Sequence, residues 1–294
     1  MTDTTEPRRG KLPLEFTPNL LGKEYREVCE AMQRIPQSKN VFDPTRYDPR
    51  AIESCRSMWH QRMEFEHRST VVFSNLVHQL FEANASLDAK VVMLRMAQDE
   101  VRHTETCANV VRALGGDPTM EIPLDFAPLA QHKGCTPEER ALRNVIYTTC
   151  LSEMIAVARF VETLEHTTDP YMRDANRALL SDEKMHGQFG FLYLEAWQPW
   201  LEAHPEARAG LTRYLRHSLV VLEQALAGPD VHYPELTADE LALGVVDPNS
   251  GRDVFYSTIE GAVLPGLDRF GLEASKAWRE RRLEPGAPAP PPVR

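Results

Sequence analysis

The chain has 294 residues, of which 42% are hydrophobic and 26% charged, enough to bury a large core in one big domain or two smaller ones. Its formal net charge of -10 repels phosphate backbones, and no Lys/Arg-rich stripe offsets that charge, which argues against nucleic acid as a partner. No apolar run approaches the roughly 20 residues of a membrane span, and the N-terminus lacks a signal-peptide core. We therefore expect a cytoplasmic protein without a membrane partner.

The two ends of the chain are predicted to be irregular. Residues 1–49 are rich in proline and form an N-terminal extension, with a short helix near residues 22–35. Residues 284–294, EPGAPAPPPVR, form a Pro-rich, extended tail. The five cysteines are odd in number and include no C-x-x-C pair, which indicates free thiols rather than disulfides, a zinc site or a rubredoxin-type site.

Between these ends the hydrophobic periodicity is that of helices, and no run of alternating β-branched residues indicates a strand. Helices are predicted at residues 50–84, 87–114, 137–167, 170–198, 206–227 and 252–282. Residues with capping or terminating preferences stand at several of these limits: Ser86, Thr136 with Pro137, and Asp169 before helices, and Gly115-Gly116 after one. We therefore expect an all-α protein.

The connections between the helices predict how they pack. The first and second helices, and the third and fourth, are joined by short turns, so each pair should be antiparallel. Segment 115–136 has about 20 residues without periodicity, which is long enough to run the length of a bundle. We therefore predict a four-helix bundle with one long crossover at residues 50–200. Residues 201–283 would form additional helices packed on the bundle.

The second and fourth helices carry the same short motif. The stretches DEVRH and DEKMH begin at Asp99 and Asp182 and both read Asp-Glu-x-x-His. Read at steps of three and four residues, the inward faces of these helices are largely apolar or small. They are interrupted near the middle by the glutamate and the histidine of each motif: Glu100, His103, Glu183 and His186.

The inward faces of the first and third helices each carry one carboxylate, Glu66 and Glu153. Glu64 is the alternative to Glu66 on the first helix. It shares a face with polar residues such as His60 and His78, whereas Glu66 lies on the apolar face, so Glu66 is preferred.

Four buried carboxylates would cost several kcal/mol each without compensation, and the inward faces contain no arginine or lysine. Two divalent cations would balance the four negative charges, and two neutral imidazoles would complete the coordination. The i, i+3 spacing places each glutamate and histidine on one helix face. We therefore predict a dinuclear metal site formed by Glu66, Glu100, His103, Glu153, Glu183 and His186.

These residues resemble the ligand set of ferritin-like non-haem diiron carboxylate proteins, and the similarity covers residues 50–198. The resemblance implies that Glu66 and Glu153 are single-carboxylate ligands, that Glu100 and Glu183 bridge the metals, and that His103 and His186 bind one iron each. It further implies that Asp99 and Asp182 accept the far ring N–H of the histidine on the opposite helix. DEVRH matches the D-E-x-R-H form of bacterial multicomponent monooxygenases and acyl-carrier desaturases, whereas DEKMH has Met185 in place of the arginine.

The resemblance also implies the chemistry. We expect two iron ions, with manganese or mixed occupancy left open, and O2 as co-substrate. The protein would be an oxygenase or oxidase acting on a small organic molecule by hydroxylation, N-oxygenation or desaturation, with the six ligands as its catalytic residues. No G-x-G-x-x-G fingerprint is present, so electrons would come from an external reductase or ferredoxin. A homodimer through the later helices is expected from general tendencies.

Other functions stay open at this point. The main alternative is a ferroxidase or iron-handling protein, and a second is a metal-free helical scaffold. Cys107 stands where the small subunit of ribonucleotide reductase has its radical tyrosine, and Leu179 stands where aromatic-amine N-oxygenases of the p-aminobenzoate type place an additional histidine. Tyr193 is expected to be a core tyrosine with a hydrogen-bonded hydroxyl. Gly187 and Gly190 would mark either room near the site or close helix packing.

Overall fold

The computed structural model describes residues 9–13, 27–28, 32, 38–123, 129–227 and 232–281. These residues are nearly all helical, so the predicted all-α class is confirmed. Of the short helix expected near residues 22–35, only residues 27–28 and 32 are described, and they are helical; the Pro-rich tail lies outside the described residues. No described helix combines the length and apolar character that crossing a membrane requires.

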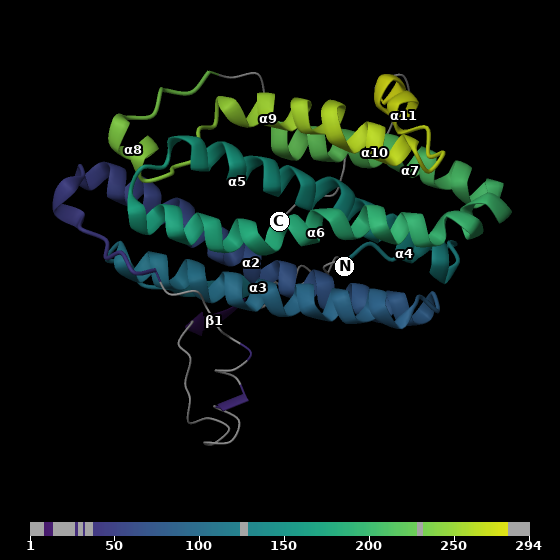
Figure 1. Cartoon of the computed structure of the whole chain (residues 1–294), viewed down its shortest axis with the longest axis horizontal. Helices are drawn as coiled ribbons and strands as arrows, with labels where there is room; N and C mark the ends of the chain where they lie inside the picture. The colour runs from purple at the N-terminus through teal and green to yellow at the C-terminus, as the bar shows by residue number, and fades with distance from the viewer. Residues whose placement is uncertain are drawn as a thin grey trace, which may run out of the picture.

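Four long helical segments lie side by side (Figure 1). They consist of α2 (Pro49–Glu82), α3 (Leu87–Ala113), the run α4 (Pro137–Val145), η2 (Ile146–Glu153) and α5 (Met154–His166), and α6 (Pro170–Ala203). Helix α2 packs along α3, and α6 packs along η2 and α5; α3 also meets α6, and α2 meets α4. Residues 115–136 connect the two antiparallel pairs.

The helix ends follow from local sequence. Thr136 and Glu139 form a capping box at the start of α4. The Asp169 carboxylate accepts a hydrogen bond from the Met172 backbone N–H at 3.0 Å and caps α6. Gly115 ends α3 with a φ of 75°, a conformation that glycine adopts without strain. Ser86 precedes α3, but its side chain makes no capping hydrogen bond.

The third predicted helix is interrupted by the π-helical segment η2, which the sequence did not indicate. Two glycines of α6 pack against this region. A Cβ atom on Gly190 would lie 3.1 Å from the Cys150 backbone nitrogen and would overlap the side chains of Thr149 and Cys150. A Cβ atom on Gly187 would lie 3.1 Å from Met154 Sδ. The glycines therefore permit close packing of α6 on η2 and α5, and η2 ends at Glu153.

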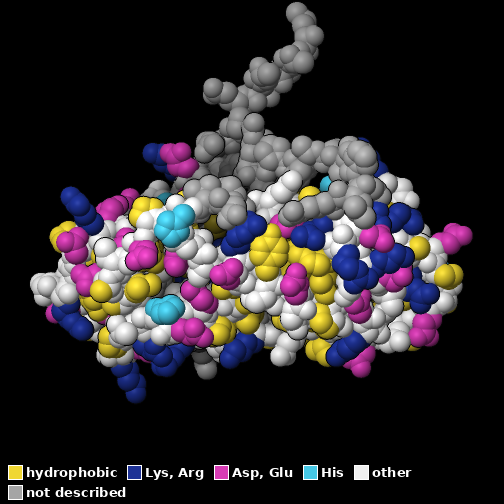
Figure 2. Space-filling model, turned by 90° about the horizontal axis from the view of Figure 1, so that it is seen from above, with side chains coloured by type: hydrophobic (Ala, Val, Ile, Leu, Met, Phe, Trp, Pro, Cys, Tyr) yellow, Lys and Arg dark blue, Asp and Glu magenta, His cyan; other side chains and the backbone are white. Residues whose placement is uncertain are grey.

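A second layer of shorter helices covers one side of the four long segments (Figure 1). It contains α7 (Pro205–Leu222), η3 (Glu223–Ala227), α8 (Ala238–Ala242), α9 (Ser250–Thr258), η4 (Ile259–Val263), α10 (Leu264–Asp268) and α11 (Ala274–Glu280). The prediction of one helix at residues 252–282 is wrong, because the helical segment ends after α10. The chain turns there, with Gly271 at a φ of 71°, before α11 begins. Figure 2 shows acidic and basic side chains intermixed on the face seen from above.

Two short strands are present although the sequence analysis predicted none. Strands β1 (Arg9–Pro13) and β2 (Thr119–Pro123) form an antiparallel ribbon in which Gly10 lies opposite Ile122 and Lys11 opposite Glu121. Neither strand has the alternating β-branched residues that identify a strand in sequence. A 3-10 turn, η1 (Pro44–Arg46), precedes α2.

The apolar core has two parts. One contains Trp59, Met63, Cys107, Met172 and Leu179, and the other contains Phe73, Met93, Met96, Ile146 and Phe189. Along α2, α3 and α6 the predicted metal ligands lie between residues of the first part and residues of the second. The polar cluster therefore lies in the middle of the bundle, with apolar side chains on both sides along the helix axes.

Candidate metal centre

The six predicted ligands all lie in one cluster in the middle of the four long segments. Glu100, His103, Glu183 and His186 are at most 2% exposed, Glu66 is 8% exposed and Glu153 is half-buried. Their atoms form two groups that could each hold a metal ion, and within each group the potential ligand atoms lie within 4.8 Å of one another.

The first group surrounds His103 and contains Glu66, Glu100 and Glu183. The distance from His103 Nδ1 is 3.1 Å to Glu183 Oε1, 3.5 Å to Glu66 Oε2 and 3.9 Å to Glu100 Oε2. Residues from α2, α3 and α6 therefore meet at this end of the cluster.

The second group contains His186, Glu183 and Glu153. The distance from His186 Nδ1 is 3.3 Å to Glu183 Oε2 and 3.1 Å to Glu100 Oε1. Glu183 thus presents one oxygen to each histidine, and Glu100 does the same. These two carboxylates lie between the two groups, which is the placement that a bridge between two ions requires.

Three atoms of the cluster show that it suits metal ions. His103 Nδ1, His186 Nδ1 and Glu183 Oε2 are buried and have no hydrogen-bond partner in the described part of the chain. Leaving a buried polar atom unpaired costs about 1–3 kcal/mol. Divalent cations between the two histidines would take these lone pairs, and a mixture of carboxylates and imidazoles suits iron or manganese better than magnesium.

Each histidine lies next to an aspartate of the other motif, on the side of its ring that faces away from the glutamates. His103 Nε2 lies 3.4 Å from Asp182 Oδ2, and His186 Nε2 lies 3.4 Å from Asp99 Oδ2. A proton on Nε2 can be donated to the aspartate, which leaves the Nδ1 lone pair directed at the centre of the cluster.

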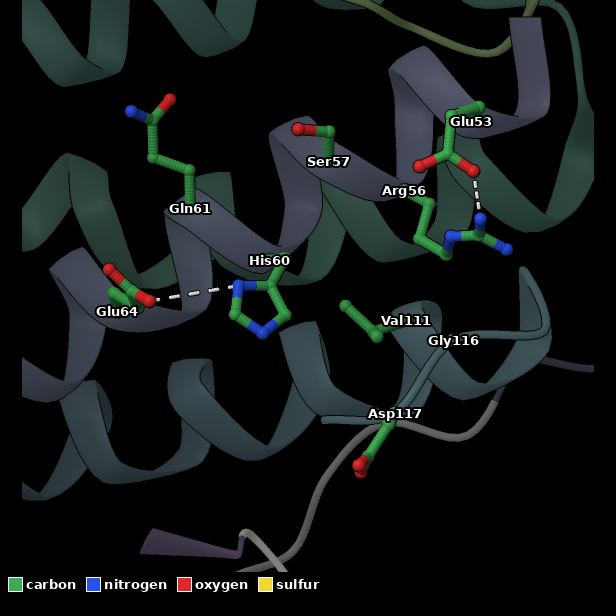
Figure 3. A pocket seen from close by; sticks show the side chains of 9 residues that line it. All are labelled: Glu53, Arg56, Ser57, His60, Gln61, Glu64, Val111, Gly116 and Asp117. Carbon is green, nitrogen blue, oxygen red and sulfur yellow. Dashed lines mark hydrogen bonds and ion pairs between the residues drawn. The ribbon is translucent and has the colours of Figure 1, made fainter. Parts of the chain in front are cut away.

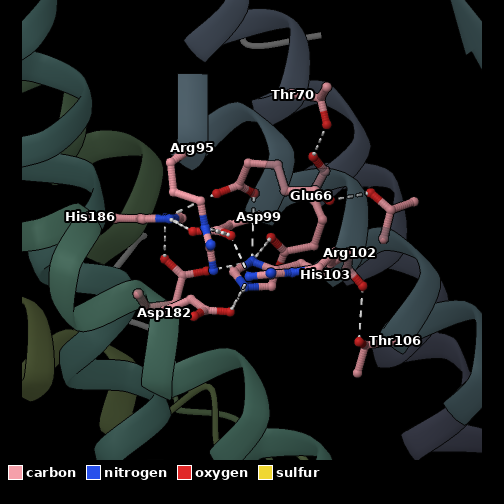
Figure 4. Close-up of polar contacts among 12 residues, drawn as sticks. Glu66, Thr70, Arg95, Asp99, Arg102, His103, Thr106, Asp182 and His186 are labelled. Carbon is pink, nitrogen blue, oxygen red and sulfur yellow. Dashed lines mark hydrogen bonds and ion pairs between the residues drawn. The ribbon is translucent and has the colours of Figure 1, made fainter. Parts of the chain in front are cut away.

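Two arginines hold these aspartates, and the sequence analysis missed both roles (Figure 4). Arg102 donates from Nη2 to Asp99 and, at 2.9 Å, to Asp182 Oδ2. Arg95 donates from Nε to Asp99 Oδ1 at 2.6 Å. Arg95 and Arg102 stand four residues before and three residues after Asp99, on the same face of α3. That spacing was the available signal.

The pKa shifts of the glutamates reflect a crowded, buried set of charges. Burial raises the pKa of Glu100 well above its usual value, and the neighbouring Glu183 and Glu66 raise it further. Burial, Glu183 and Glu100 do the same for Glu153. Burial also disfavours the charged form of Glu183, but the attraction of the two nearby histidines outweighs it and lowers the pKa of Glu183.

The histidines show the complementary behaviour. Burial opposes protonation of His103 and His186, but the surrounding carboxylates outweigh burial and raise both pKa values well above the usual one. The carboxylates therefore favour positive charge in the middle of the cluster, and divalent cations would supply it.

Four other buried side chains lie in the helical segments that carry the ligands: Phe73, Cys107, Cys150 and Tyr193. Cys107 and Cys150 are fully buried free thiols, and burial raises the pKa of both. Phe73 contacts the edge of His186 with ring centroids 5.7 Å apart. Tyr193 is a core residue as expected, but its buried hydroxyl has no hydrogen-bond partner among the described residues.

Glu64, the alternative to Glu66, lies outside the cluster. Its Oε1 is 3.7 Å from His60 Nδ1, and both side chains line a polar cavity of about 450 Å³ between α2 and the end of α3 (Figure 3). His60 Nε2 also lies 3.0 Å from the Thr119 carbonyl oxygen of β2. None of the six predicted ligands lines this cavity.

Comparisons of the chain with models of protein families, with curated proteins and with solved structures give no match.

Proposed function

We propose that the chain is a ferritin-like, O2-activating non-haem diiron oxygenase or oxidase that acts on a small organic substrate. One observation supports this above all others. Two imidazole Nδ1 atoms and a carboxylate oxygen converge in the buried middle of the bundle without hydrogen-bond partners, and the aspartates behind the histidines orient those nitrogens toward one another.

The six predicted ligands would bind two metal ions. Glu66 and His103 would serve one ion, Glu153 and His186 the other, and Glu100 and Glu183 would reach both. Two iron ions held in this way would supply electrons for the reduction of O2.

The chain contributes rigidity and exclusion of water. Arg102 joins Asp99 to Asp182, so both histidines are held through one guanidinium. Apolar side chains lie on both sides of the cluster along the bundle, including Met63 and Met96, which are fully buried. A dry site of this kind favours reaction with substrate over wasteful reaction with solvent.

Several further expectations belong to the same proposal. Turnover needs electrons from a separate reductase or ferredoxin, because the chain has no flavin or nicotinamide fingerprint. A homodimer and a cytoplasmic location are also part of it. The choice among hydroxylation, N-oxygenation and desaturation depends on the substrate.

The test is anaerobic loading with Fe(II), metal counting, and rapid mixing with O2 while the optical spectrum is followed. An oxygenase predicts two ions per chain and a transient absorption band that decays faster when a suitable amine or arene is added. Growth of a ferric mineral without such a transient would favour iron storage instead. Glu100→Ala and His186→Ala should lower the metal count while Glu64→Ala does not, and an unchanged count in all three variants would contradict the ligand set.

A further inference from the structure

A cavity of about 490 Å³ lies beside the metal centre, between the first half of α3 and the second half of α6. Its size falls within the roughly 300–1,000 Å³ range of small-molecule sites. None of the six predicted ligands lines it, so it is separate from the coordination positions. Its walls are mostly apolar and include three aromatic side chains, Phe189, Tyr193 and Trp197, together with Val92, Met185 and Leu192.

The cavity lies where the two Asp-Glu-x-x-His motifs differ. The first motif has Arg102, whose guanidinium joins the two aspartates. The second motif has Met185 at the equivalent position, and Met185 lines the cavity. An apolar wall therefore stands on this side of α6 where a second arginine would have placed a charge.

Arg95 supplies the positive charge of the cavity from α3. Its Nε donates to Asp99 Oδ1 at 2.6 Å, and the side chain is 51% exposed. No described residue accepts a hydrogen bond from its terminal nitrogens. A guanidinium with free terminal N–H groups binds a carboxylate or sulfonate in a planar, two-point manner.

One carboxylate also lines the cavity, and it fixes the orientation of an anion. Asp88 stands seven residues before Arg95, which is two turns along α3. A negatively charged group would be repelled at the Asp88 end and attracted at the Arg95 end. The aromatic walls of the cavity are on α6, with Phe189 and Tyr193 rings 5.9 Å apart and Tyr193 and Trp197 rings 5.6 Å apart.

We propose that this cavity binds a flat, apolar organic anion, with its ring system against Phe189, Tyr193 and Trp197 and its anionic group on Arg95. Because Arg95 also donates to Asp99, which lies beside His186, the ligand would be connected to His186 through Arg95 and Asp99. The site does not depend on the proposed oxygenase activity, and it can be tested with or without iron.

The test uses two fluorescent probes that differ in one charged group. 8-Anilinonaphthalene-1-sulfonate carries a sulfonate, and N-phenyl-1-naphthylamine has the same rings without it. We expect one saturable site for the anion, with affinity at least about tenfold higher than for the neutral probe, because a hydrogen bond to a charged group is lost. Equal affinities would overturn the assigned role of Arg95.

Four variants locate the site. Arg95→Met should weaken binding of the anion about tenfold or more and leave the neutral probe unaffected, while Arg95→Lys should retain most of the affinity. Ala196→Phe, at an exposed residue lining the cavity, should weaken both probes by filling space. Arg112→Met removes the same charge near the other end of α3 and should change nothing.

Binding of the probe to the open surface beside the cavity would give a different pattern among the variants. Leu94 is 55% exposed beside the cavity but does not line it. If Leu94→Asn lowers binding while Arg95→Met and Ala196→Phe do not, the probe binds the open surface and the proposal is wrong. Circular dichroism and the metal count of each variant separate loss of binding from loss of the fold.

Discussion

The two helical hairpins, α2–α3 and α4–η2–α5–α6, contribute alike to the candidate metal centre but differ in what surrounds it. Each hairpin supplies one single glutamate and one Glu-x-x-His pair. Around these donors, Arg102 of the first hairpin corresponds to Met185 of the second, and Cys107 corresponds to Gly190. The inward-facing donors are repeated, whereas the residues that hold and pack them are not.

The difference is clearest at the two aspartates. The Asp99 side chain is fully buried and accepts hydrogen bonds from both Arg95 and Arg102. The Asp182 side chain is 29% exposed, and Arg102 is the one arginine among the described residues that donates to it. Nearly identical motifs therefore hold their histidines in unequal surroundings, and the two halves should respond unequally to the same substitution.

The largest effect is expected where the halves share a residue. Glu183 belongs to both groups of ligand atoms, so Glu183→Gln should weaken binding of both ions by more than the roughly 10- to 100-fold typical of residues that act through a ligand. Glu66→Gln should weaken one ion only, because Glu66 belongs to the first group alone. Fe(II) or Mn(II) titration with metal analysis measures both.

Glu64→Gln is the matched control, since Glu64 lies on the same helix outside the cluster. Wild-type binding of both ions by Glu183→Gln would show that the two groups do not share this carboxylate.

Exchanging each aspartate for asparagine tests the asymmetry directly. Asp99→Asn should weaken metal binding about 100-fold and Asp182→Asn nearer tenfold, because Asp99 is buried and its loss deprives two arginines of an anionic acceptor. Competition with a metal chelator gives the affinities. Equal losses, or a larger loss for Asp182→Asn, would mean that burial and the second arginine do not matter.

Packing of the second hairpin can be tested at Gly190. Gly190→Ala should lower the free energy of unfolding by about 1–3 kcal/mol, because the added Cβ overlaps Thr149 and Cys150 of η2. Gly261→Ala is the control, since Gly261 is also a helical glycine, in η4, but a Cβ there meets no atom within 4 Å. Urea unfolding of the two variants gives the comparison, and equal stabilities would contradict the close approach.

The smallest difference is expected at the helix starts. Asp169→Ala should lower the free energy of unfolding by about 1 kcal/mol, because Asp169 caps α6 and also accepts from the Tyr47 hydroxyl at 2.9 Å. Ser86→Ala should change it by no more than a few tenths of a kcal/mol, since Ser86 makes no capping bond to α3. Thermal unfolding measures both, and a larger loss at Ser86 would reverse the assignment.

Local signals in the sequence were sufficient for much of the fold. Thr136 with Pro137 and the glycine after α3 act through neighbouring residues only, and they placed the start of α4 and the end of α3. The periodicity of each helix placed Glu66 inward and Glu64 outward. The break at Gly271 was also within reach, because a glycine in the left-handed conformation commonly stands just after the last residue of a helix.

The remaining features depend on contacts between distant segments. The π segment η2 packs against Gly190 of α6, about 40 residues further along the chain, and a pattern within residues 137–167 does not carry that information. Strands β1 and β2 pair across more than 100 residues and have no β-branched alternation. Arg95 and Arg102 stood at helical spacing from Asp99, but arginines at such spacing are common on exposed helix faces.

The π segment also affects how related sequences would have to be aligned. A π turn holds about one residue more than an α turn, so a homologous bundle with an uninterrupted α-helix here would be one residue shorter ahead of Glu153. Each α-helical residue turns the chain by about 100°. An alignment of the two sequences without a gap would therefore pair Cys150 and the residues before it with residues whose side chains point in a different direction.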